Sequence, residues 1–194
     1  MNMMSIRHPN LELGFDNQPY LATARLDLRK VVEADIVSVQ SALSRYEVAR
    51  MLVAVPQPFD RIDAKQIVDR WSQATVPGWG FGLSLTDDAN KTLIGLLWIR
   101  WRDEKWRLGM WLVPEYWGQG IMSEALNIVL QAFFRNCMGA TISAGVIADN
   151  PASLRVQQKL GFEIVGTSQA FCLSRNEMVD VIETELTFGG FMPL

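Results

Sequence analysis

The stretch VPEYWGQGIMSEAL, residues 113–126, constrains the fold of this chain more than any other. Its two glycines, Gly118 and Gly120, lie between an apolar run typical of a strand (106–113) and an amphipathic run typical of a helix (123–136). A helix N-terminus carries unpaired N–H groups and partial positive charge, and glycine lets an anion approach them closely. The stretch therefore predicts a strand–turn–helix unit that can hold a phosphate or pyrophosphate. Taken alone, Gly-x-Gly is better explained as a tight turn without a ligand.

Two common phosphate-binding motifs are excluded at this turn. No Gly-Lys-Ser/Thr follows the glycines, as a P-loop requires. No third glycine follows at the spacing of the dinucleotide-binding fingerprint, and Ala125 instead lies inside the expected helix.

A second segment, NPASLRVQQKLGF (150–162), has the marks of a short helix with defined ends. Asn150 is a favourable N-cap residue, and Pro151 suits the first helical position. Gly161 suits the residue that follows the C-cap. These features are ordinary helix caps when considered alone.

The rest of the chain predicts a mixed α/β sheet, because an antiparallel series of strands precedes a strand–helix–strand–helix–strand series. We expect strands at 24–31, 78–86, 91–101, 106–113, 140–148, 162–173 and 178–188. We expect helices at 33–52, 60–74, 123–136 and 151–160.

Composition narrows the class of protein. The 194 residues fit one globular domain, and a net charge of −3 gives no general attraction to nucleic acid or to anionic membranes. No apolar run is long enough to span a bilayer, and the first residues lack the apolar core of a secretory signal. Cys137 and Cys172 form neither a disulfide framework nor metal spacing, and His8 is the single histidine, so we expect a cytoplasmic protein without a metal site.

Together, segments 113–126 and 150–162 resemble the paired signature of the GNAT acetyltransferase superfamily. VPEYWGQGIMSEAL looks like the branch of ribosomal-protein N-terminal acetyltransferases (RimJ/RimL-like), and TARLDLRKVVEAD (23–35) and RYEVARMLVAVPQPF (45–59) are similar to earlier parts of that branch. The resemblance implies a GNAT domain at 23–188, with an extension at 1–22 and a tail at 189–194. It also implies a mixed, mostly antiparallel sheet of about seven strands, splayed between two central strands and flanked by about four helices.

The resemblance also implies acetyl-CoA as co-substrate and assigns residues to it. The strand before the glycines would pair with the pantetheine arm, and an N–H near Met110 or Trp111 would polarise the thioester carbonyl. Asn150 matches an asparagine that contacts pantetheine or the acceptor, and Ser153 matches a serine proposed to protonate the leaving thiolate. The full set of implied cofactor-binding residues is Met110, Leu112, Val113, Trp117, Gly118, Gln119, Gly120, Ile121, Met122, Ser123 and Asn150.

Two positions depart from the family pattern. Glu115 stands where many members have Gln or Arg, which removes one contact to an anion. Gln157 stands where many members have a tyrosine that acts as general acid, so the acid is either Ser153 or water. For Ser153, support of the first helical turn is the alternative role.

The implied reaction is direct attack of an amine on the thioester. The acceptor would be a protein N-terminal α-amine or a small-molecule amine, and the alternative is a non-catalytic acyl-CoA-binding or sensor module. Glu33, Glu47, Asp103 and Glu104 are possible bases by position, but none stands out from ordinary solvated charges. We expect the acceptor pocket between 45–59 and the last two strands, most of the central tryptophans in the core, and Cys137 in the core. The sequence leaves a homodimer open.

Overall fold

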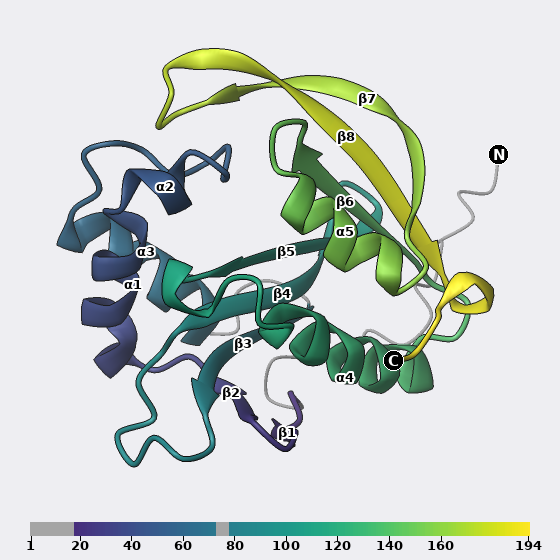
Figure 1. Cartoon of the computed structure of the whole chain (residues 1–194), viewed down its shortest axis with the longest axis horizontal. Coiled ribbons are helices and arrows are strands. Elements are labelled where there is room, and N and C mark those ends of the chain that lie inside the picture. The colour runs from purple at the N-terminus through teal and green to yellow at the C-terminus, as the bar shows by residue number, and fades with distance from the viewer. Residues whose placement is uncertain (1–17, 73–77) are drawn as a thin grey trace, which may run out of the picture.

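The computed structural model describes residues 18–72 and 78–194. Eight strands form a single sheet in the order β1-β2-β3-β4-β5-β6-β8-β7, and every neighbouring pair is antiparallel except β5 and β6 (Figure 1). The strands are β1 (Leu21–Ala22), β2 (Leu26–Lys30), β3 (Gly78–Leu85), β4 (Gly95–Arg102), β5 (Lys105–Leu112), β6 (Thr141–Ile147), β7 (Glu163–Cys172) and β8 (Glu177–Thr187). The predicted mixed, mostly antiparallel sheet is therefore confirmed, and the short β1 adds one strand to it.

Among the described residues, five α-helices flank the sheet: α1 (Ile36–Leu43), α2 (Tyr46–Ala49), α3 (Arg61–Ser72), α4 (Ile121–Asn136) and α5 (Pro151–Lys159). The predicted single helix at 33–52 is wrong. It is a 3-10 turn (Glu33–Asp35) followed by α1 and α2, because Arg45 is extended at ψ 116°. Side chains hold this break: Ser44 Oγ donates to Gln40 O at 2.6 Å, and Gln57 Nε2 donates to Leu43 O at 2.9 Å.

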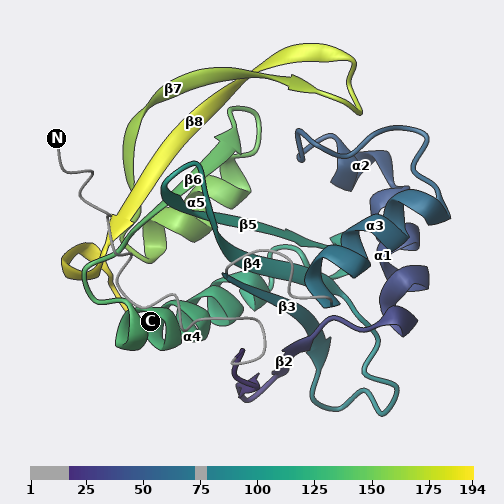
Figure 2. The ribbon, with the colours of Figure 1, turned by 180° about the vertical axis from the view of Figure 1, so that it is seen from behind.

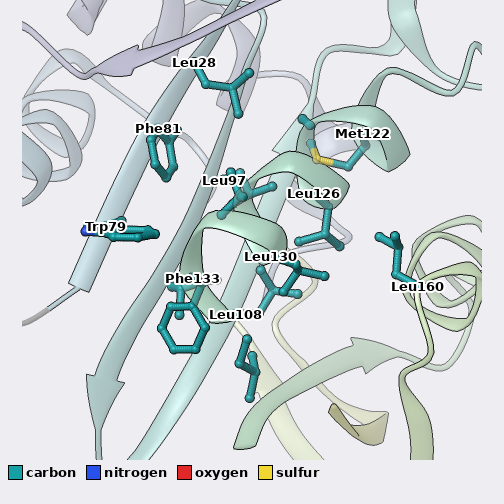
Figure 3. Close-up of a cluster of buried hydrophobic side chains, with 14 of the residues drawn as sticks. Leu28, Trp79, Phe81, Leu97, Leu108, Met122, Leu126, Leu130, Phe133 and Leu160 are labelled. Carbon is teal, nitrogen blue, oxygen red and sulfur yellow. The ribbon is translucent and has the colours of Figure 1, made fainter. Parts of the chain in front are cut away.

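The two faces of the sheet are covered by different helices. Helices α4 and α5 lie on one face, and α1 to α3 lie on the other (Figures 1 and 2). Because α4 repeats apolar residues every three or four positions, Leu126, Leu130 and Phe133 all point at the sheet, where Leu97 and Leu108 meet them (Figure 3). These five side chains are at most 5% exposed, and this layer is the main core.

Most of the tryptophans stabilise the core, as the sequence predicts. Trp79 and Trp106 both contact the Phe133 ring edge-on, at centroid distances of 6.1 and 5.1 Å. On the other face, Trp71 of α3 stacks on Trp98 of β4 at 5.7 Å. Within residues 18–72 and 78–194, no helix is long and apolar enough to cross a membrane.

Candidate functional site

The sheet opens between its two parallel strands. Strands β5 and β6 pair at three positions only, from Trp106↔Ile142 to Leu108↔Ala144. Beyond Leu108, β5 stays paired with β4 up to Leu112, while β6 stays paired with β8 up to Ile147. The predicted splay between two central strands is thus present, at the carboxyl ends of the parallel pair, where ligands of open α/β sheets bind.

Met110 and Leu112 turn their main-chain groups into this opening. Val113 N–H donates to Ile94 O of the β4 side at 2.9 Å. Because hydrogen-bonded pairs alternate along an antiparallel ladder, Trp111 and Gly109 also bond to β4, whereas Met110 and Leu112 face the other way. Leu112 O accepts the indole N–H of Trp117 at 2.7 Å. Met110 N–H, Met110 O and Leu112 N–H therefore remain for a ligand.

Val113 is placed differently from these two residues. Its N–H is bonded to Ile94, and its carbonyl accepts Tyr116 N–H at 3.1 Å. Both of its main-chain groups are therefore engaged within the protein, and only its partly buried side chain is left to touch a cofactor.

The glycine turn leads from the end of β5 into α4, as predicted. Gly118 and Gly120 have φ of 72° and 76°, in the left-handed region that glycine adopts at low cost. A Cβ on Gly118 would meet nothing within 4 Å, and a Cβ on Gly120 would meet only Arg25 Nη2, at 3.8 Å. Glycine at these two positions therefore allows the left-handed conformation of the turn and leaves the space beside it free of side chains.

Six consecutive backbone N–H groups of this turn have no hydrogen-bond acceptor in the described parts of the chain. The first helical bond of α4 runs from Glu124 N to Gly120 O, which leaves the N–H groups of residues 118–123 unbonded. The side chains of Ile121, Met122 and Ser123 are at most 8% exposed. A ligand that binds these three residues would do so through their main-chain N–H groups, as the macrodipole of α4 favours for an anion.

Side chains hold the turn in place. Arg25 Nη1 donates to Gln119 O at 3.1 Å, and Arg25 Nε donates to Glu124 at 2.8 Å, so the residue just before β2 holds the turn in place. The Gln119 side chain donates to Glu115 O at 2.7 Å and stays within the loop. Arg25 also adds a half-exposed cation beside Gly120, which the sequence did not single out because it lies 94 residues away from Gln119.

Glu115 is neutralised by the helical layer. Arg45 Nη1 lies 2.5 Å from its carboxylate. A hydrogen bond from its own amide and the Arg45 guanidinium lower the pKa of Glu115, so it stays ionised and paired. The ion pair of Glu115 therefore links the α1–α2 junction to the segment that leads into the glycine turn.

Asn150 caps α5, as predicted. Its Oδ1 accepts Ser153 N–H at 3.1 Å, which leaves the amide group of Asn150 for a ligand. Ser153 is half-buried in the first turn, and its hydroxyl has no hydrogen-bond partner among the described residues. Gln157 is only 2% exposed, and its Oε1 accepts the Thr184 hydroxyl at 2.6 Å, so it belongs to the core.

Ion pairs and hydrogen bonds join the end of α2 to the β7–β8 hairpin, on the side of the opening where we expected the acceptor. Arg175 at the hairpin tip bonds Asp149 through both Nη atoms, at 2.8 and 2.9 Å, and Arg50 adds a third bond at 2.9 Å. Leu173 N–H donates to Val53 O at 3.0 Å. The Arg175 guanidinium, with help from Arg50, lowers the pKa of Asp149, which directly precedes Asn150.

Three of the four carboxylates considered as bases lie away from this opening or are already paired. Asp103 and Glu104 form the exposed β4–β5 turn, at the amino end of β5. Glu47 lies 2.5 Å from Arg45. Burial raises the pKa of Cys137, which fits a core thiol and not a nucleophile. No group of residues suited to a metal ion occurs in the part of the chain that the structure describes.

Comparison with known proteins agrees with this geometry. The chain matches the model of the acetyltransferase (GNAT) domain over residues 25–163. It is 27% identical over 167 residues to the uncharacterized N-acetyltransferase YoaA of Bacillus subtilis, an alignment that covers 79% of this chain and 88% of the relative.

Two solved structures share the fold at low sequence identity. Ribosomal-protein-S5-alanine acetyltransferase from Vibrio fischeri superposes with a TM-score of 0.70 at 20% identity, over 91% of this chain and 100% of that one. Spermidine N-acetyltransferase from Vibrio cholerae, solved with CoA and spermine, gives a TM-score of 0.69 at 18% identity, over 87% and 99%.

Proposed function

This chain belongs to the acetyltransferase (GNAT) family, and from that premise we propose that it transfers the acetyl group of acetyl-CoA directly to the α-amine of a protein N-terminus or to a small amine of similar pKa. The observation that carries the proposal is the opening between β5 and β6. Unbonded main-chain groups of Met110 and Leu112 lie on one side of it, and the six free amides of residues 118–123 follow directly along the chain.

Each half of the opening suits one part of acetyl-CoA. The extended pantetheine arm contains amides, which can pair with Met110 and Leu112 as an added strand would. The pyrophosphate is an anion that amide N–H groups at a helix N-terminus bind well, and glycines keep that approach free of side chains. In this arrangement Met110 N–H lies where it can donate to the thioester carbonyl and stabilise the negative charge that develops there.

Ser153 is our candidate for the acid that protonates the leaving thiolate. Its hydroxyl is not consumed by a hydrogen bond within residues 18–72 and 78–194, and it sits in the first turn of α5, which begins where β6 ends. Gln157 cannot take this role, because it is buried and an amide is not an acid in this pH range.

The preference for an α-amine follows from the proton that the attacking nitrogen must lose. An α-amine with a pKa of about 8 is roughly a tenth neutral at pH 7, whereas a lysine with a pKa of about 10.4 is well under a thousandth neutral. The difference corresponds to about 3 kcal/mol that the site need not supply. The resemblance to the N-terminal acetyltransferase branch supports the same choice.

A matched pair of short peptides tests the proposal. One peptide has a free N-terminus and no lysine, and the other has a blocked N-terminus and one lysine; CoA release is followed with acetyl-CoA present. We expect turnover of the first peptide only, with a rate that rises with pH and levels off near the pKa of its amine.

Three other outcomes have distinct meanings. Preferential turnover of the blocked, lysine-bearing peptide would contradict the α-amine proposal. Turnover of neither peptide but of spermidine would indicate a small-molecule acceptor. No turnover of any amine, with acetyl-CoA binding intact, would contradict the enzyme and support the non-catalytic sensor.

A further inference from the structure

Two glycines face each other where the sheet begins to open. The last pair between β5 and β6 is Leu108↔Ala144, and the next residues on the two strands are Gly109 and Gly145. Gly109 pairs with Trp98 on β4, and Gly145 pairs with Glu183 on β8. One row across four strands therefore reads Glu183, Gly145, Gly109, Trp98.

These four residues share the face of the sheet opposite α4 and α5. Glu185 on β8 contacts Lys105 of β5 at 3.3 Å and Ser143 of β6 at 3.0 Å, which places these three side chains on one face. Because side chains alternate along a strand, Gly109, Gly145 and Glu183 belong to the same face. Leu108 and Ala144 belong to the other face, in the core under α4.

The row has two glycines in the middle and a different side chain at each end, Trp98 and Glu183. A Cβ on Gly109 would lie 2.0 Å from Trp98 Cζ2, so the indole lies directly over that glycine. A Cβ on Gly145 would lie 3.0 Å from Val181 Cγ1 and 3.8 Å from Glu183 Oε2, so both side chains stand beside that glycine. Glycine in a strand allows close approach of another group, and Met110, whose N–H faces the opening, directly follows Gly109.

Glu183 differs from the other carboxylates around the opening. Ser168 Oγ donates to its Oε1 at 2.6 Å, and no lysine or arginine of the described chain lies within ion-pair distance of it. By contrast, Glu115, Glu124 and Asp149 are each paired with arginine. A half-buried carboxylate without a counter-ion favours a cationic ligand.

The Trp98 end of the row does not attract a cationic ligand. Arg100 already stacks on the Trp98 ring, with its guanidinium carbon 4.6 Å from the ring centroid. An ammonium group entering the row is therefore repelled at the Trp98 end and attracted at the Glu183 end.

We propose that Glu183 receives the acceptor amine as a cation in this row and takes the proton that its nitrogen loses during transfer. The inference rests on the proposed function and names its acceptor as a primary amine that enters protonated, from the face opposite α4 and α5.

The ammonium gives one proton to water through the row, and the free nitrogen lone pair forms a C–N bond to the thioester carbon, whose C=O electrons move onto oxygen. The nitrogen, now acidic, gives a second proton to Glu183 Oε2. The C=O bond then reforms, the C–S bond breaks, and the thiolate takes a proton from Ser153 or water. Ser153, when it is the donor, regains a proton from water. Glu183 returns its proton to solvent.

Glu183→Gln tests this role, because glutamine keeps the shape and the acceptor atom for Ser168 but cannot take a proton. With the free-N-terminus peptide, we expect kcat/KM for the amine to fall by about 10²–10³-fold, while the KM for acetyl-CoA and the melting temperature stay unchanged. Glu183→Asp should recover part of the loss. The matched control is Asp180→Asn on the same strand, an exposed carboxylate bonded to Gln169, which should keep wild-type rates.

The outcomes separate the two proposals. A wild-type enzyme that acetylates the peptide while Glu183→Gln keeps kcat/KM within about threefold would overturn the role of Glu183 and leave the proposed function standing. An equal loss in Asp180→Asn would also overturn it. A wild-type protein that acetylates no amine at all would contradict the proposed function and this inference with it.

Discussion

Replacement of Gly120 by aspartate should abolish acetyl-CoA binding while leaving the fold intact. Gly120 is the N-cap of α4, with φ 76° and ψ 0°, and its Cβ position is clear of all atoms but Arg25 Nη2 at 3.8 Å. A left-handed L-residue costs about 1–2 kcal/mol, and an N-cap carboxylate returns about 0.5–1 kcal/mol through bonds to the first helical amides. The net loss of folding free energy should therefore be about 1 kcal/mol.

The carboxylate of Asp at position 120 would also compete with the pyrophosphate for the same N–H groups. It accepts from the amides of the first turn and places a negative charge where the anion would lie. Loss of two charge-assisted hydrogen bonds, at about 1.5–3 kcal/mol each, amounts to about 3–6 kcal/mol. At 1.4 kcal/mol per decade, the Kd for acetyl-CoA should rise by about 10²–10⁴-fold.

Calorimetric titration with acetyl-CoA measures this loss, and thermal unfolding by circular dichroism verifies the fold. Gly120→Asn is the matched control: it has the same shape and backbone cost without the charge, and should lose less affinity. A Kd for Gly120→Asp within about threefold of wild type, at an unchanged melting temperature, would refute the assignment of the pyrophosphate to this turn.

Other changes test other parts of the structure. Ser153→Ala should lower kcat by about 10²-fold with unchanged acetyl-CoA affinity in steady-state assays, and an equal kcat would leave water as the acid. The pKa of Asp149 is lowered in the folded state, so its ion pair with Arg175 contributes fully to stability above the ordinary carboxyl pKa of about 4. That contribution is lost as the pH falls through the lowered pKa. Asp149→Asn should remove this acid dependence from urea unfolding and lower the free energy of unfolding by about 1 kcal/mol or less. Gly161→Ala should cost about 2–3 kcal/mol in the same unfolding assay, because φ is +95° and its Cβ would lie 1.9 Å from Gly190 O.

The sequence predicted the local geometry of the glycine turn and of the α5 cap well, because its signals are local. The strand, Gly118, Gly120 and the first turn of α4 are contiguous, and the cap at Asn150 reaches Ser153 three residues later. Such features depend on backbone conformation and neighbouring residues, which the sequence shows directly. The boundaries of α4 and α5 accordingly fall close to those predicted.

The prediction of one helix at 33–52 failed for a reason that lies outside the segment. Its apolar spacing is compatible with a continuous helix, but Gln57 bonds the carbonyl of Leu43, and Ser44 bonds both Gln40 and Phe59. These bonds from the following loop make the end of α1 at Ser44 favourable. Periodicity alone does not reveal them.

The row proposed to receive the acceptor could not be predicted because it is assembled across distant strands. Glu183 meets Gly145 only through the β6–β8 register, and Gly145 meets Gly109 only through the β5–β6 register. Arg175 and Asp149 are brought together by the long β7–β8 hairpin. In the sequence these residues look like ordinary charged residues. Their positions along the chain therefore gave no reason to prefer Glu183 over Asp103 or Glu104 as a base.

Amide chemical shifts of the protein labelled with ¹⁵N, followed during titration with acetyl-CoA, test the central claim most directly. We expect the largest shifts at Met110 and Leu112 and at residues 118–123, whose N–H groups are free to bind the co-substrate, with a smaller change at Val113, whose N–H is bonded to Ile94. Saturable binding that shifts other amides and leaves residues 118–123 unchanged would contradict it.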